Sequence, residues 1–155
     1  MKATLFKVVG LSLLLMLAPY AKAQTLNPIQ FQDQHGADMA LTDTVTWMIF
    51  SHHNDGAKLV KAAIDQAGIT DFSQYNGLYV ADISRMPALV TRLFAMPAMR
   101  KYEFNMALDR DGDLTQSLPR EEARVTLVKL DNLTIVEQNY VDSVDAILAF
   151  INANR

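Results

Sequence analysis

Two adjacent histidines mark the stretch of this chain whose residue types offer the most chemistry. The sequence there reads His52-His53-Asn54-Asp55. Imidazoles and carboxylates are metal ligands, and backbone amides at a helix start bind anions. Three roles are therefore open: a metal site, a site for an anionic ligand or peptide, and a turn whose polar groups cap a helix. Adjacent histidines usually point apart and His35 has no fixed relation to them, so a turn is favoured over a metal site, and an anionic ligand over a metal.

Three aspartates at alternate positions form a second candidate, and they are Asp109, Asp111 and Asp113. Alternating carboxylates converge on the ion in calcium loops. Such a loop also needs glycine at its sixth position and glutamate at its twelfth, where this chain has Leu114 and Arg120. The pattern therefore favours a tight surface turn. These aspartates remain minor candidates for metal binding, together with the two histidines.

Other catalytic patterns are incomplete. Glu121 and Glu122 have no specified partner, and Ser51 beside His52 is not a catalytic triad, because sequence adjacency does not supply the geometry. The six glycines form no GxGxxG phosphate loop, and the chain has no cysteine. We predict no catalytic residue and no cofactor. The alternative is a redox accessory that uses a metal or flavin-type cofactor near His52 and His53.

The first 23 residues have the pattern of a cleavable signal peptide. Lys2 and Lys7 precede an apolar run over residues 8–18, which is followed by Ala21-Lys22-Ala23. The run is shorter than the roughly 20 residues of a membrane-spanning helix, and small residues two apart suit signal peptidase. We expect cleavage after Ala23, a periplasmic or secreted protein without a stable membrane anchor, and one domain over residues 24–155.

Removal of this segment makes the protein acidic. It takes away three lysines and no acid, so 14 − 3 = 11 basic residues face 17 acidic ones, a net charge of −6. An acidic chain repels phosphate backbones, and the basic residues form no stripe along the sequence. We therefore expect no nucleic-acid partner. The partner, whether a protein or a small ligand, stays unknown.

Hydrophobic periodicity predicts alternating strands and helices. A strand over residues 45–50, a helix over 55–67 capped by Asn54 or Asp55 and stopped by Gly68, and a strand over 78–83 form a parallel βαβ unit. Residues 87–99 are helical, with a break near Ala95 and Met96 because Pro97 lies inside the pattern. The apolar residues of this segment that we expect to be buried are Leu89, Val90, Leu93, Phe94 and Met96. The remaining expected elements are a hairpin (29–31 and 39–41), a strand (104–108), a short helix (114–118), a second hairpin (125–130 and 133–136) and a last helix (144–151).

This order resembles the thioredoxin superfamily, in the branch of peroxiredoxins and of the periplasmic thioredoxin-like proteins of cytochrome maturation. The resemblance lies in four segments of the chain: IQFQDQHGADMAL, WMIFSHHNDGAKL, ALDRDGDLTQSL and VTLVKLDNLTIVEQNYVDSVDAILAFI. It implies an α/β, thioredoxin-like fold: a central mixed β-sheet flanked by helices, with an N-terminal β-hairpin.

The resemblance also implies where the family's chemistry would lie. Its Cys-x-x-Cys falls near Asn54 and Ala57, and its cis-proline at Arg124 or Val125, so neither feature is present. Without a thiol, thiol-disulfide exchange and peroxide reduction are excluded. We expect a redox-inactive binding or accessory protein with candidate ligand-binding residues His52, His53, Asn54, Asp55 and Arg124. The other alternative is a structural subunit that pairs through an apolar patch at residues 96–106.

Overall fold

The computed structural model describes residues 23–155, so the first 22 residues of the predicted signal peptide lie outside the described part. The strands are β1 (Ile29–Gln32), β2 (Asp38–Leu41), β3 (Trp47–Ser51), β4 (Gly77–Asp82), β5 (Ala107–Asp109), β6 (Val125–Asp131) and β7 (Thr134–Val141). The helices are α1 (Asn54–Ala67), the 3-10 helix η1 (Phe72–Tyr75), α2 (Ala88–Val90), the π-helix η2 (Thr91–Ala95), α3 (Met96–Met99) and α4 (Val144–Asn154). No helix within residues 23–155 is long and apolar enough to cross a membrane.

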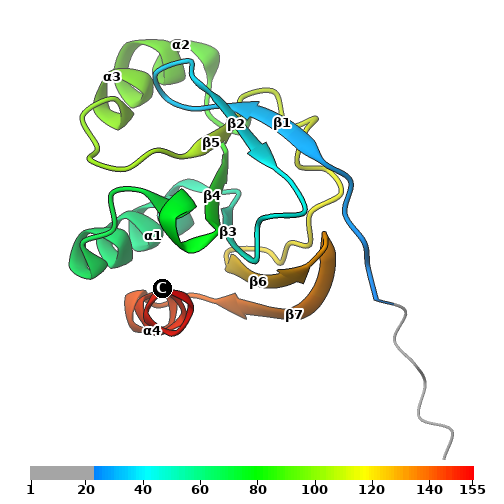
Figure 1. Cartoon of the computed structure of the whole chain (residues 1–155). Helices are drawn as coiled ribbons and strands as arrows, with labels where there is room; N and C mark the ends of the chain where they lie inside the picture. The colour runs from blue at the N-terminus through cyan, green and yellow to red at the C-terminus, as the bar shows by residue number, and fades with distance from the viewer. Residues whose placement is uncertain (1–22) are drawn as a thin grey trace, which may run out of the picture.

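The seven strands form one mixed sheet in the order β2-β1-β5-β4-β3-β6-β7. The three central strands, β3, β4 and β5, run parallel, and the strands on either side of them are antiparallel. Both predicted hairpins are present, and β3 and β4 pair in parallel across α1, as predicted. Figure 1 shows α1 and α4 side by side, with α2 and α3 beyond α1.

Alternation along the strands divides the interior into two cores. In β3, Trp47 and Ile49 belong to the core that α1, α3 and α4 cover, whereas Met48 and Phe50 belong to the other core. Residues outside the strands that cover this second core include Leu26, Val45, Leu118 and Leu133. Because successive side chains of a strand point to opposite faces, a strand buried on both faces shows the continuous apolar run seen in β3.

Helix α1 begins one residue before the predicted start. Its N-cap is His53, with extended backbone angles, and not Asn54 or Asp55. Gly68 ends the helix in the left-handed conformation with φ 67°, as predicted, and its amide donates to the Ile64 carbonyl. The first turn of α1 thus follows β3 after only two residues, which places the double histidine between them.

The segment that contains Pro97 differs from expectation in what it buries. Two helical pieces do meet at Ala95 and Met96, as predicted. Proline has no N–H and its ring clashes with the carbonyl four residues earlier, and here the turn before it is widened, since the Met96 amide donates to the Thr91 carbonyl. Met96 is buried, but the other four apolar residues predicted to be buried are exposed: Leu89 (67%), Val90 (43%), Leu93 (53%) and Phe94 (69%). A helical pattern with apolar residues on two faces does not show which face the core covers.

The apolar patch at residues 96–106, on which the structural-subunit alternative rested, is not exposed, because Met96, Met99, Phe104 and Met106 are buried in the first core. These methionines fill the core beneath α3. The exposed apolar surface of this region lies earlier in the chain, at residues 89–94.

Strand β5 is shorter than the predicted strand over 104–108. The side chain of Gln34, which is fully buried, donates from Nε2 to the Phe104 carbonyl (2.7 Å) and accepts from the Met106 amide (3.1 Å). The Gln34 side chain thus makes the hydrogen bonds to residues 104 and 106 that a neighbouring strand would otherwise make.

The predicted helix over residues 114–118 is also absent, and this stretch forms turns. The carboxylate of Asp109 accepts hydrogen bonds from the Gly112 and Thr115 amides, which ties the segment back to the end of β5. Pro119 follows directly and cannot supply the N–H that a continuing helix needs.

Candidate functional site

The carboxyl ends of the three parallel strands meet at one edge of the sheet, where open α/β sheets bind their ligands. His52 follows β3, Asp82 ends β4 and Asp109 ends β5. All three side chains are buried. This edge, with the first turn of α1, is the candidate functional site.

His52 is held in the structure by the loop before β6. Its Nε2 lies 2.9 Å from the Glu121 carbonyl oxygen, and the residue is 1% exposed. A carbonyl only accepts, so Nε2 is the donor of this hydrogen bond. Among residues 23–155 the Nδ1 atom has no hydrogen-bond partner. The His52 side chain therefore anchors the 119–124 loop through Nε2.

His53 lies over the first turn of α1. Its ring packs on that of His52, with centroids 5.2 Å apart, and covers Gly56, where an added Cβ would lie 2.6 Å from the His53 Cε1. Burial lowers the pKa of His53 and the neighbouring His52 lowers it further, which together outweigh the raising effect of Asp55. Glycine at position 56 is thus what allows the imidazole to fold back onto the helix.

The other predicted ligand-binding residues point outward. Asn54 and Asp55 are exposed, and Asp55 pairs with Lys58 at 3.0 Å. Arg124 is level with His52 across the sheet but is also exposed, and it binds the Glu121 carboxylate (3.5 Å) and the Tyr140 carbonyl (3.5 Å). The structure therefore brings His52 and His53 together and leaves Asn54, Asp55 and Arg124 on the rim.

The candidate metal ligands do not converge. Within residues 23–155, no three His, Cys, Asp or Glu side chains are placed to share an ion. His35 lies in the turn between β1 and β2, and two strands, β5 and β4, separate β1 from β3. Of the aspartates, Asp109 accepts three hydrogen bonds from Gly112 and Thr115, whereas Asp113 binds Gln116. The third, Asp111, is exposed and lines two surface hollows, one of them together with Asp109 and Asp113. The 109–113 segment is a turn organised by Asp109.

A buried polar network at this edge has no counterpart among the sequence predictions. Arg120 reaches Asp82 at 3.3 Å, and Thr115 donates to the Asp109 carboxylate at 2.8 Å. Burial raises the pKa of the Asp82 carboxyl, but hydrogen bonds from Ser84 and the charge of Arg120 bring it below its ordinary value. The position of Asp82 at the end of a buried strand could have indicated this network, whereas no local pattern marks Arg120.

The space beside His53 is small. A cavity of about 90 Å³ lies between α1, β4 and α3, far below the roughly 300 Å³ at which ligand pockets begin. On its wall the hydroxyls of Tyr79 and Ser51 are 2.9 Å apart, and burial raises the pKa of Tyr79 far above its ordinary value. This cavity therefore fits at most part of a side chain or a few ligand atoms.

Comparisons with known proteins bear on the fold. No protein-family model matches the chain, and no curated protein does. Among solved structures, the peroxidoxin BcpB from Mycobacterium tuberculosis is similar, with a TM-score of 0.55 and 14% identity over 86% of this chain and 97% of that one. The thioredoxin domain of a thiol-disulfide oxidoreductase from Bacteroides vulgatus is similar with a TM-score of 0.51, 15% identity and coverage of 84% and 94%.

A third similar structure is the pneumococcal exposed lipoprotein thioredoxin from Streptococcus pneumoniae, with a TM-score of 0.54, 10% identity and coverage of 82% and 99%. At these identities the comparisons speak to the fold alone. The mixed sheet flanked by helices, the N-terminal hairpin and these similarities show that the chain has the thioredoxin-like fold, in a form that contains no cysteine.

Proposed function

We propose that this protein is an exported thioredoxin-like domain that is not a thiol catalyst and binds a partner protein through the surface formed by Leu89, Val90, Leu93 and Phe94. We call this the 89–94 surface. One observation carries the proposal. Of the seven large apolar side chains exposed among residues 23–155, four lie within these six residues. Contiguous apolar patches on soluble proteins mark interaction sites.

The state of the sheet edge supports the absence of thiol catalysis. The chain has no cysteine, and Asn54 begins α1 at the place where the fold's redox proteins carry their first one. The polar groups that do lie there have structural partners, with His52 on the Glu121 carbonyl and Asp82 on Arg120. These side chains hold loops in place. Because none of them is a thiol, the role that we propose for this fold is binding.

Export is supported by the sequence of the first 23 residues, with its basic start, its apolar run and the small residues Ala21 and Ala23. One of the similar structures is described as an exposed lipoprotein thioredoxin. If export occurs as proposed, the protein recovered from the periplasm or medium has Gln24 as its first residue by intact-mass measurement. A measured mass that still includes residues 1–23 would contradict the predicted cleavage site.

Site-specific crosslinking tests the partner surface. A photoreactive residue at Phe94 should yield one discrete product in cells that make the protein, and the double change Leu89→Ser with Leu93→Ser should abolish it. The matched control is a photoreactive residue at Val136, which is also apolar and 62% exposed but lies on β7. Equal products at both positions, or none at Phe94, would refute a specific surface. A product with a second copy of the chain would instead support the structural-subunit alternative.

The redox-accessory alternative rests on the two imidazoles, because Nδ1 of both His52 and His53 lacks a hydrogen-bond partner among the described residues. Elemental analysis and an absorption spectrum of the native protein separate it from a plain binding protein. Stoichiometric metal that is lost in His53→Ala would favour it. Ligand binding by His52, His53, Asn54, Asp55 and Arg124 stays a prediction, which thermal-shift screening of the same variant addresses.

A further inference from the structure

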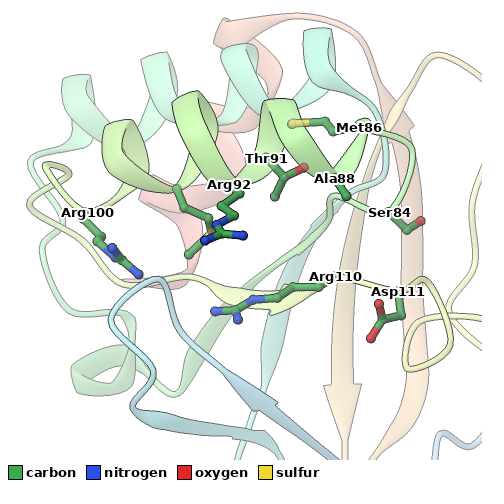
Figure 2. Close-up of a pocket in the computed structure, with 9 residues that line it drawn as sticks. Ser84, Met86, Ala88, Thr91, Arg92, Arg100, Arg110 and Asp111 are labelled. Carbon is green, nitrogen blue, oxygen red and sulfur yellow. The ribbon is translucent and has the colours of Figure 1, made fainter.

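A second, larger hollow lies on the other side of the α2 to α3 segment. It has a volume of about 760 Å³, which is within the range of roughly 300–1,000 Å³ typical of small-molecule pockets. Its walls come from η2, from the end of α3 and from the loop after β5. Figure 2 shows Arg92 and Arg100 extending from the helical segment toward the side on which Arg110 lies.

The charges in this pocket are unequal. Arg92, Arg100 and Arg110 line it, with Asp111 as its one carboxylate, so the formal charge of the lining is 3 − 1 = +2. In Figure 2, Asp111 lies beside the backbone end of Arg110, whose guanidinium points away from it toward Arg92 and Arg100. The whole chain has a net charge of −3. The lining of this pocket is therefore positive although the chain as a whole is negative.

The three pocket arginines also differ from other arginines in their pairing. Arg85, Arg120 and Arg124 each form an ion pair with a carboxylate. Across residues 23–155, the ion pairs include none made by Arg92, Arg100 or Arg110. Like charges that line one pocket repel one another, and the single carboxylate of Asp111 does not balance three arginines. An anion bound between them would relieve that repulsion.

One of the three is fixed in place. The Arg100 Nε donates to the Gln34 carbonyl at 3.0 Å, and Gln34 is itself buried and bound to residues 104 and 106. This contact holds the guanidinium and leaves its terminal nitrogens free to donate. The hydroxyls in the wall are already used as donors, Ser84 to Asp82 and Thr91 to the Pro87 carbonyl. Recognition of an anion here therefore falls to the guanidinium groups.

We propose that this pocket binds a small molecule that carries two or more phosphate or carboxylate groups. Guanidinium forks match the paired oxygens of both groups, and three arginines from separate elements can hold more than one such group at once. Met86, Met96 and Ala88 on the wall add apolar contact for the body of the ligand. Asp111 disfavours further negative charge at its own end. The pocket shares its helical segment with the 89–94 surface, since Thr91 and Arg92 line it, but the two sites use different side chains.

Isothermal titration of the purified protein with pyrophosphate, and separately with citrate, tests the proposal and distinguishes a phosphate from a carboxylate ligand. In buffer of about 0.05 M salt, where charges are weakly screened, saturable binding of at least one probe is expected. Arg92→Gln and Arg110→Gln should each weaken it by about tenfold or more, since each removes a charged hydrogen-bond donor. Asp111→Asn should strengthen binding severalfold.

The matched control is Arg155→Gln, which removes the same charge from an exposed arginine that does not line the pocket. It should leave the affinity within about twofold, because it removes no donor from the pocket wall and the effect of an exposed charge is weakened by solvent and salt. Melting temperatures near that of the parent protein show that the variants are folded. No binding of either probe by the parent protein, or equal weakening by Arg155→Gln, would overturn the proposal. An intact crosslink from Phe94 in the Arg110→Gln variant shows that the two sites fail separately.

Discussion

Substitution of Gln34 is expected to lower the stability of the protein more than most single substitutions, because its side-chain amide is buried and bonded at both ends. Its two ends satisfy the Phe104 carbonyl and the Met106 amide, both in buried surroundings. Gln34→Leu leaves both backbone groups without partners, at about 1–3 kcal/mol each. Set against about 1 kcal/mol from the added apolar burial, the net loss is about 1–5 kcal/mol, compared with the roughly 5–15 kcal/mol of a typical domain.

Gln34→Glu makes the same argument dependent on pH. The introduced carboxylate still accepts from the Met106 amide, but it has no proton for the Phe104 carbonyl, and burial disfavours its charge. Its pKa in the folded state is therefore raised above the value of about 4.3 in the unfolded chain. A raised pKa gives stability that is present at low pH and lost as the pH rises through the folded value. The deficit relative to the parent protein should thus shrink as the pH falls from 7 toward about 4.

Urea unfolding followed by circular dichroism measures both effects. The matched control is Gln32→Leu, the same substitution on an exposed side chain of the same hairpin, for which a change of less than about 0.5 kcal/mol is expected. The reasoning is refuted if Gln34→Leu and Gln32→Leu unfold at the same urea concentration. It is also refuted if the deficit of Gln34→Glu grows as the pH falls.

Three further predictions concern other parts of the structure. Gly56→Ala should push the His53 ring off α1, so that an NMR titration shows the pKa of His53 rising toward its ordinary value. In the parent protein the lowered pKa makes the free energy of unfolding fall as the pH drops below about 6.5, and the variant should lose this pH dependence. Arg120→Gln should raise the pKa of Asp82 and destabilise the protein by about 1–3 kcal/mol at pH 7. A lowered carboxyl pKa stabilises fully above the unfolded pKa of about 3.9 and loses this effect as the pH falls through the folded pKa, so the difference should shrink at lower pH, and a difference that stays the same there would count against it. Leu89→Ser should change the free energy of unfolding by less than about 0.5 kcal/mol, whereas Met99→Ala should cost about 2–4 kcal/mol in the same urea assay, with equal losses contradicting the assignment of inside and outside.

The elements that sequence predicted well are those whose signals are local. The apolar run at Trp47, the glycine that ends α1 and the two-residue turn of the second hairpin are each set within a few residues. The structure places that turn at Asn132 and Leu133, one residue later than predicted. The resemblance to thioredoxin-like proteins then predicted the mixed sheet and its flanking helices correctly. Most elements begin or end within a few residues of the predicted positions.

What sequence could not supply depends on distant contacts. Gln34 binds residues 104 and 106 from at least 70 residues away, where β5 was predicted to begin, and no periodicity indicates such a hydrogen bond. The pocket arginines are scattered along the chain without a stripe, and only the topology brings Arg92 and Arg110 together. Leu89 and Phe94 have the apolar character of core residues, and the widened turn before Pro97 belongs to the segment that leaves them outside.

The attachment of the first described residues has a consequence for how the chain becomes complete. Thr25 pairs with Thr134 across 109 positions, and the Leu26 amide donates to the Leu133 carbonyl. Leu26 also helps to close the second core. Contacts that join such distant positions form late, since a long loop must close first. During synthesis from the amino end, residues 25 and 26 therefore cannot bind their partners until residues 133 and 134 have been made. Until then Leu26 cannot cover its part of the second core, and the apolar side chains there stay accessible to other molecules.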